Sequence, residues 1–165
     1  MSLAGQRLDP ERYQVVPRTL VFGFRDGRVL LERVPPGRGA WAGRWNGVGG
    51  HVERGESPAA AARREFHEET GLTLTALRLA GQVIVDLGPT AGIGISVFAG
   101  RVGQGQARGG EEGELAWFSM DEVQSAPTVE DVPVLLARAR ACLDGDPPFT
   151  AVYRYDDGRL SIVID

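Results

Sequence analysis

Three glutamates lie close together near the middle of the chain: Glu65, Glu68 and Glu69. On a helix, the spacings i, i+3 and i+4 place their carboxylates on one face, where like charges repel each other unless a cation compensates them. Hard carboxylate oxygens suit Mg²⁺, with Mn²⁺ as the alternative, and these ions commonly share their ligands with substrate phosphates. The cluster therefore predicts a divalent-metal site that acts on a phosphate compound.

A longer pattern distinguishes this cluster from an ordinary surface helix. An isolated EXXEE is typical of a solvated helix face. Here the surrounding residues also match the pattern GX5EX7REUXEEXGU, in which U is a bulky apolar residue. A chance match in a chain of this length is below about one in a million at ordinary residue usage. Every fixed position agrees: Gly50, Glu56, Arg64, Glu65, Phe66, Glu68, Glu69, Gly71 and Leu72.

This pattern is similar to the signature of the Nudix hydrolases. The resemblance implies an α/β fold, a Nudix-type α/β/α sandwich with a mixed β-sheet, and hydrolysis by substitution at phosphorus. It also implies that Glu65, Glu68 and Glu69 bind the divalent ions, often together with a backbone carbonyl at Gly49 or Gly50. By the same resemblance, an ion pair between Arg64 and Glu56 fixes the loop against the helix, which is a structural role, and Gly71 belongs to the motif as the residue that ends the helix.

The general base is left open between several carboxylates. Glu65 and Glu68 are candidates on the helix. Glu112 is a third, because it lies five residues before Trp117, where similar sequences often place a glutamate that binds metal or acts as the general base. A solvated acidic loop is the alternative interpretation of residues 111–114.

The resemblance extends upstream to residues 45–53, WNGVGGHVE, which look like the WNGxGGxVE stretch of MutT-type and oxidised-purine nucleoside triphosphatases. Asn46 would then read the base, because an amide can both donate to and accept from a purine edge. The alternative is that Asn46 only shapes a turn before Gly47.

One segment departs from the oxidised-purine enzymes, which carry a tryptophan and two acids before the last long helix. Here the acids are present as Glu130 and Asp131, but the aromatic residue is missing. Trp41 is a candidate to stack on the base, with a packing role as the alternative. Arg33 is a candidate to steer or clamp the phosphates, although scattered loop arginines are usually solubilising.

Three functions follow, in order of preference. The first is a MutT-like nucleoside triphosphate pyrophosphohydrolase that releases the monophosphate and pyrophosphate, with 8-oxo-dGTP as one candidate substrate. The second is an ADP-ribose or nucleotide-sugar diphosphatase. The third, from another class, is a non-catalytic nucleotide-sensing module. The presence of every motif glutamate favours the enzymes.

The elements that must position these residues can be read from turn and cap signals. Asp26-Gly27 predicts a β-hairpin over residues 18–33, and a loop over 35–43 leads to a short strand at 45–48. Ser57 and Pro58 predict the start of a helix that runs to residue 69. We expect strands at 72–87, 93–102 and 115–118, a helix at 130–143, and a second hairpin at 149–164 around Asp157-Gly158.

Length and charge narrow the protein class. The 165 residues, 42% of them hydrophobic, predict a single domain over 1–165. The net charge of -4 argues against binding to duplex nucleic acid. No apolar stretch approaches the roughly 20 residues needed to span a bilayer. With one cysteine, Cys142, and a polar N-terminus, we expect a cytoplasmic protein that binds a small-molecule nucleotide as a monomer or homodimer.

Overall fold

The computed structural model describes residues 9–109 and 113–165, and the strands among them form one mixed sheet. The strand order is β3-β2-β1-β5-β4-β7-β8, and β6 pairs with β2 beside this path. The pairs β1–β5 and β4–β7 are parallel, while the other pairs are antiparallel. The strands are β1 (Gln14–Arg25), β2 (Arg28–Arg33), β3 (Trp45–Asn46), β4 (Leu74–Asp86), β5 (Ala91–Val102), β6 (Glu114–Ser119), β7 (Phe149–Asp156) and β8 (Arg159–Ile164).

Two tight hairpins confirm the turn predictions. Asp26 and Gly27 have φ of 51° and 75°, and Asp157 and Gly158 have φ of 50° and 76°. Positive φ at both central residues matches the right-handed twist of the flanking strands, and Asp-Gly tolerates it. The first hairpin joins β1 to β2, and the second joins β7 to β8.

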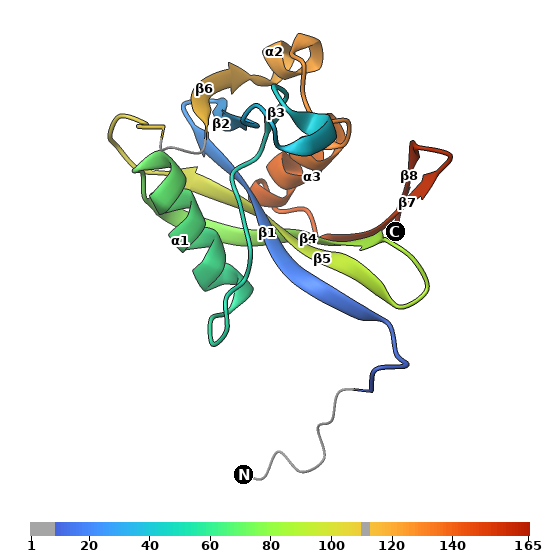
Figure 1. Cartoon of the computed structure of the whole chain (residues 1–165). Helices are drawn as coiled ribbons and strands as arrows, with labels where there is room; N and C mark the ends of the chain where they lie inside the picture. The colour runs from blue at the N-terminus through green and yellow to red at the C-terminus, as the bar shows by residue number, and fades with distance from the viewer. Residues whose placement is uncertain (1–8, 110–112) are drawn as a thin grey trace, which may run out of the picture.

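Helices cover both faces of the sheet, which confirms the predicted α/β/α sandwich (Figure 1). On one face lies α1 (Pro58–Thr70), which begins where the Ser57 hydroxyl accepts a hydrogen bond from Ala60 N at 3.2 Å and ends at Gly71 with φ of 69°. On the other face lies α3 (Val132–Leu143), whose Leu135 and Leu136 are buried against the sheet. The predicted caps therefore set the bounds of α1.

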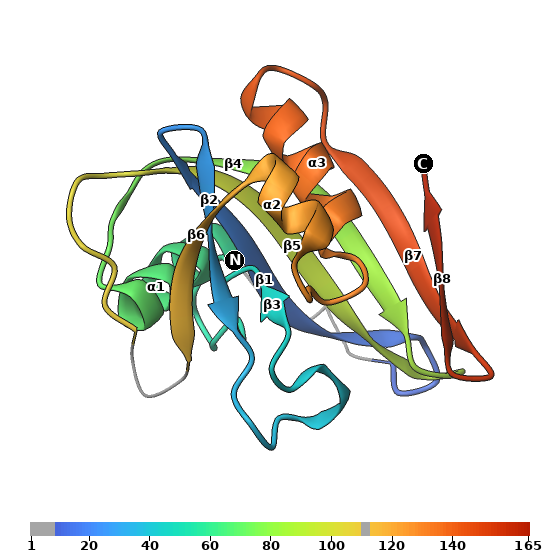
Figure 2. The ribbon, with the colours of Figure 1, turned by 90° about the horizontal axis from the view of Figure 1, so that it is seen from above.

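Two short elements were not predicted. A 3₁₀ turn, η1 (Gly39–Trp41), lies in the loop expected over residues 35–43. The helix α2 (Met120–Ser125) precedes α3 and lies beside it (Figure 2). Its signal was present in the sequence, because Ser119 and Glu122 form a capping box in which each side chain bonds to the backbone of the other.

The predicted strand at 45–48 is shorter than expected. Only Trp45 and Asn46 pair with β2, and the chain then crosses to β1, where Val48 forms an isolated bridge with Val21. This crossing takes the glycine-rich segment along the central strand β1.

Across residues 9–109 and 113–165, none of the helices has the length and apolar character required to cross a bilayer.

Candidate active site

The packing of α1 on the sheet depends on Phe66. This side chain is fully buried, which contributes roughly 1.5–3 kcal/mol, and its ring lies directly over Gly23 of β1. A Cβ added at Gly23 would lie 2.6 Å from Cζ of Phe66, so a larger residue there would push the helix away from the sheet. The close approach fixes α1, and with it Glu65, Glu68 and Glu69, at a set height above β1.

The glycine-rich segment is held to β1 by backbone hydrogen bonds. Val21 N donates to Val48 O at 2.7 Å, Thr19 N donates to Gly50 O at 2.9 Å, and Val52 N donates to Pro17 O at 3.1 Å. Gly49 is required by this close approach, because a Cβ there would lie 2.1 Å from the carbonyl oxygen of Thr19. The loop therefore behaves almost as a further strand beside the first half of β1.

Gly50 leaves room for the Glu65 carboxylate. A Cβ at Gly50 would lie 2.5 Å from Cδ of Glu65, so this carboxylate reaches the loop only because position 50 has no side chain. Gly49, Gly50, Glu65 and Glu69 line one cavity of about 640 Å³. Their carboxylate and carbonyl oxygens are the hard donors that Mg²⁺ and Mn²⁺ prefer, so the residues at this end of the cavity fit a divalent cation.

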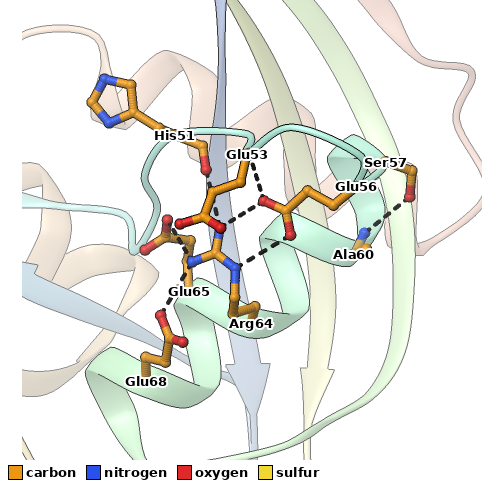
Figure 3. A network of polar contacts seen from close by, with 8 residues as sticks. All are labelled: His51, Glu53, Glu56, Ser57, Ala60, Arg64, Glu65 and Glu68. Atoms are coloured by element: carbon orange, nitrogen blue, oxygen red, sulfur yellow. Dashed lines mark hydrogen bonds and ion pairs between the residues drawn. The ribbon is translucent and has the colours of Figure 1, made fainter.

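Arg64 is the centre of a polar network between the loop and α1 (Figure 3). Its Nη2 lies 2.7 Å from Glu56 Oε1, and its Nε lies 3.2 Å from Glu56 Oε2, which makes the pair bidentate. Nη2 also donates to the carbonyl of His51 at 3.1 Å. Glu56 Oε1 in turn accepts a hydrogen bond from Glu53 N at 2.7 Å. The predicted ion pair between Arg64 and Glu56 is present and joins residues 51–56 to the helix.

This network shifts the pKa values of both Glu56 and Arg64. The hydrogen bond from Arg64, followed by the one from the Glu53 backbone, lowers the pKa of Glu56 below its usual value. The hydrogen bond to Glu56, followed by the contacts with Glu65 and Glu68, raises the pKa of Arg64 well above its usual range. Arg64 therefore stays charged under all ordinary conditions.

Arg64 also contacts two of the three motif glutamates. Its Nη1 lies 2.9 Å from Glu65 Oε1 and 3.1 Å from Glu68 Oε2. The Glu68 side chain is 58% exposed, and Glu68 is not among the described residues that line the cavity, whereas Glu65 and Glu69 are. Within residues 9–109 and 113–165, no three Asp, Glu, His or Cys side chains are already gathered closely enough to hold a metal ion. The carboxylates share one helix face, with Arg64 beside two of them.

The other end of the cavity brings together the predicted base-reading residues. Asn46, Trp41, Glu130 and Asp131 all line it, although they come from three separate segments of the chain. The Asn46 side-chain oxygen accepts a hydrogen bond from Gly47 N at 2.8 Å, so Asn46 shapes the turn as well as facing the cavity. Both interpretations of this residue therefore have structural support.

Asp131, which is half-buried, and Tyr153, which is buried, form a polar pair at this end. Burial, the larger cause, raises the pKa of Asp131 above its usual value. The pKa of Tyr153 is raised by burial and then by the nearby Asp131 carboxylate. The Tyr153 hydroxyl makes no hydrogen bond of standard geometry with the described residues, and Asp131 does not use its side chain to cap α3. Both side chains line the cavity next to each other.

Several cavity residues had not been identified from the sequence. They lie on strands, where alternation alone does not show which side chain meets a ligand, and no local motif marks them: Arg18, Thr19, Tyr153 and Tyr155. By contrast, Arg33 is outside the described lining of the cavity, and it instead pairs with Glu114 at 3.2 Å and donates to Gly43 O. Glu112 lies outside the described residues.

Comparisons with known proteins agree with this arrangement. The model of the NUDIX domain matches residues 13–139. Oxidized purine nucleoside triphosphate hydrolase of Danio rerio is 35% identical over 127 residues, which cover 74% of this chain and 80% of the relative. The protein of the same name from Mus musculus is 33% identical over 129 residues, covering 75% and 81%. The crystal structure of a mutator MutT protein from Bacillus halodurans superimposes with a TM-score of 0.73 and 26% identity, covering 92% of this chain and 98% of that one.

Proposed function

The chain belongs to the Nudix hydrolase family, and we propose that it hydrolyses a nucleoside triphosphate to the monophosphate and pyrophosphate. The observation that carries the proposal is one shared cavity of about 640 Å³, which is lined both by the carboxylates of Glu65 and Glu69 and by Asn46 and Asp131, the candidates for binding the base. A nucleotide placed along this cavity would present its phosphates to Glu65 and Glu69 and its base to Asn46 and Asp131.

The motif glutamates would hold the divalent cation. Glu65, Glu69 and a backbone carbonyl of Gly49 or Gly50 line the cavity, and Glu68 lies one helical turn from Glu65 on the same face of α1. When bound, the cation lowers the pKa of a water molecule and offsets charge on the departing phosphate. In this proposal Glu68 exchanges its contact with Arg64 for the cation.

A carboxylate must also accept the proton of the attacking water. Glu65 and Glu68 are the described candidates, and Glu112 is the candidate outside the described residues. Glu65 is favoured by its place in the cavity, since Glu68 is largely exposed. Glu56 and Arg64 take no part in proton transfer in this scheme, because they hold the loop against the helix.

An oxidised purine is the preferred base. The two curated relatives bear the name oxidized purine nucleoside triphosphate hydrolase. Asn46, Glu130 and Asp131 offer amide and carboxyl groups at the base end, where the amide can both donate and accept a hydrogen bond and the carboxylates can accept one. That combination suits the mixed donor and acceptor edge of a purine.

A substrate screen tests the proposal. Purified protein with Mg²⁺ would be given 8-oxo-dGTP, the normal dNTPs and ADP-ribose, with separate detection of pyrophosphate, orthophosphate and AMP. Release of pyrophosphate, with 8-oxo-dGTP turned over faster than dGTP, is the expected result. Cleavage of ADP-ribose alone would replace the proposal with a nucleotide-sugar diphosphatase. Tight nucleotide binding without turnover would indicate a sensing module.

The remaining features of the proposal are Mg²⁺ as the working cation, with Mn²⁺ as a substitute, one domain over residues 1–165, a cytoplasmic location, and a monomer or homodimer. Activity measured against each cation and light scattering in solution would test the cation and the oligomeric state.

A further inference from the structure

Arg18 is a cationic side chain in the cavity that the family pattern does not include. It lies on β1, is half-buried, and lines the same cavity as Glu65 and Glu69. Within the part of the chain that the structure describes, its buried Nε has no hydrogen-bond partner. Leaving a buried donor of a charged group unsatisfied is costly, and a bound ligand is a common reason for keeping one.

The position of Arg18 along β1 places it towards the carboxylate end of the cavity. Arg18 forms an isolated bridge with His51, and its neighbour Thr19 donates to Gly50 O, beside the Glu65 carboxylate. Val21 is three residues further along β1, roughly 10 Å away at the rise of an extended strand, and pairs with Val48. Asn46 lies beyond that bridge, so along β1 Arg18 is nearer to Gly50 and Glu65 than Asn46 is. By strand alternation its side chain shares the face of Leu20 and Phe22, on which Tyr153 of the base end also lies, so Arg18 stands between the two ends.

The charges around the cavity explain why a cation is useful here. Among the described residues, four acids line the cavity, together with the arginines Arg18 and Arg38: Glu65, Glu69, Glu130 and Asp131. A divalent ion held at Glu65 and Glu69 would serve the phosphates under attack, yet the phosphate next to the sugar would still approach an acidic surface. A guanidinium is always charged and can offer two parallel N–H groups to phosphate oxygens.

We propose that Arg18 binds the phosphate group nearest the sugar, the one that stays on the nucleoside monophosphate product. The inference rests on the proposed function, because it assumes a nucleotide in this cavity. Arg18 acts as a substrate-binding residue that sets the depth of the nucleotide, and it takes no part in proton transfer. The base end needs no further cation, since Asn46 and Asp131 already supply its polar contacts.

Binding measurements without metal ion isolate this contact from turnover. Isothermal titration would compare wild type with Arg18→Gln, using two ligand pairs, 8-oxo-dGMP with 8-oxo-deoxyguanosine, and AMP with adenosine. We expect Arg18→Gln to weaken binding of the monophosphate about ten- to a hundredfold, as for loss of one charge-assisted hydrogen bond, while the nucleoside of the same pair binds as before. Arg18→Lys should recover part of the affinity, because lysine keeps the positive charge but lacks the paired N–H groups of the guanidinium.

A matched control and a fold check accompany these variants. Arg78→Gln removes the same charge from an exposed position on β4 that does not line the cavity, and it should bind like wild type. Thermal melting verifies that Arg18→Gln is folded. Equal weakening of nucleoside and monophosphate would overturn the proposal and assign Arg18 to the base or sugar. Equal affinity of wild type for the two members of both pairs would also overturn it. The substrate screen decides the proposed function separately. The binding test does not depend on its result, because the contribution of the phosphate is measured with both an 8-oxoguanine and an adenine ligand pair.

Discussion

The two ends of the cavity are built in different ways. The carboxylate end comes from one continuous stretch, residues 49–71, in which a loop and a helix are joined by the Arg64–Glu56 pair. The base end collects single residues from distant segments: Asn46 at the end of β3, Asp131 before α3 and Tyr153 on β7. Local sequence spacing can encode the first end but not the second, which exists only after the sheet has formed.

This contrast has a functional meaning. Groups that take part in phosphate chemistry must keep a fixed mutual geometry, and a short helix with a bidentate clamp provides it. Groups that select the base need only share a wall of the cavity, so each can be replaced separately. We therefore expect substitutions at the carboxylate end to abolish turnover, and substitutions at the base end to change which substrate is used.

The largest expected effect is at Glu65. Glu65→Gln keeps the shape of the side chain but removes a charge needed to hold the cation, so we expect kcat to fall on the order of a thousandfold. Steady-state kinetics with 8-oxo-dGTP would measure it. Glu53→Gln is the control, because Glu53 is an exposed glutamate of the adjacent loop. Comparable losses in both variants would mean that general loop charge, and not the cavity carboxylate, is responsible.

A second variant loosens the carboxylate end without touching the cavity. Glu56→Gln breaks the bidentate pair with Arg64, so we expect kcat to fall about tenfold through misplacement of the loop. The pKa of Glu56 is lowered in the folded state, so its contribution to stability is present above its usual pKa of 4.5 and is lost as the pH falls through the lowered value.

The melting temperature of the wild type should therefore decrease more steeply below about pH 4.5 than that of Glu56→Gln. Thermal melts of both proteins between neutral and acidic pH would measure the difference. Parallel curves would show that the pair contributes nothing to the acid sensitivity of the fold.

At the base end, Asn46→Asp separates the two roles of one residue. Aspartate keeps an oxygen that can accept the bond from Gly47 N but loses the NH₂ donor. We expect unchanged thermal stability and a roughly tenfold change in the ratio of kcat/KM for 8-oxo-dGTP over dGTP. An unchanged ratio would leave Asn46 as a turn-forming residue only. Asn46→Ala, which removes both groups, should lose stability in addition.

The smallest expected effect is at Trp41, which is 40% exposed and lines the cavity. If its ring stacks on the base, Trp41→Leu should raise KM about two- to tenfold and leave kcat nearly unchanged. Trp117→Leu would not serve as a control, because Trp117 packs under Arg25 and against the core. Leu79→Ala, on an exposed apolar residue of β4 outside the cavity, is suitable. A KM that stays constant would identify Trp41 as a packing residue.

The sequence predicted most of the fold because its signals are local. Asp-Gly turns, the Ser57 cap and the Gly71 stop each depend on a few neighbouring residues. The capping box at Ser119 and Glu122 was an available signal for α2. The shortened β3 could not be predicted, because its end depends on the bridge from Val48 to a strand far away in the sequence.

The same distinction applies to the candidate site. The ion pair of Arg64 with Glu56 was predicted from the motif and is present. Arg18, Tyr153 and Tyr155 were not predicted, since strand alternation says which face a residue shares but not that a cavity opens there. Arg33 was predicted as a phosphate clamp, but it pairs with Glu114 away from the cavity lining, so that role remains a prediction without support from its position.

The attachment of the glycine-rich loop to β1 has a consequence for how such a protein can diverge. The hydrogen bonds from Val21, Thr19 and Val52 are all between backbone atoms, so they persist whatever side chains occupy residues 51–55. Gly49 and Gly50 are constrained by lack of space, and Gly55 is constrained by its φ of 90°. New binding preferences can therefore evolve through substitutions of loop side chains, or through insertions beside the loop, while the hydrogen-bonded backbone keeps its position.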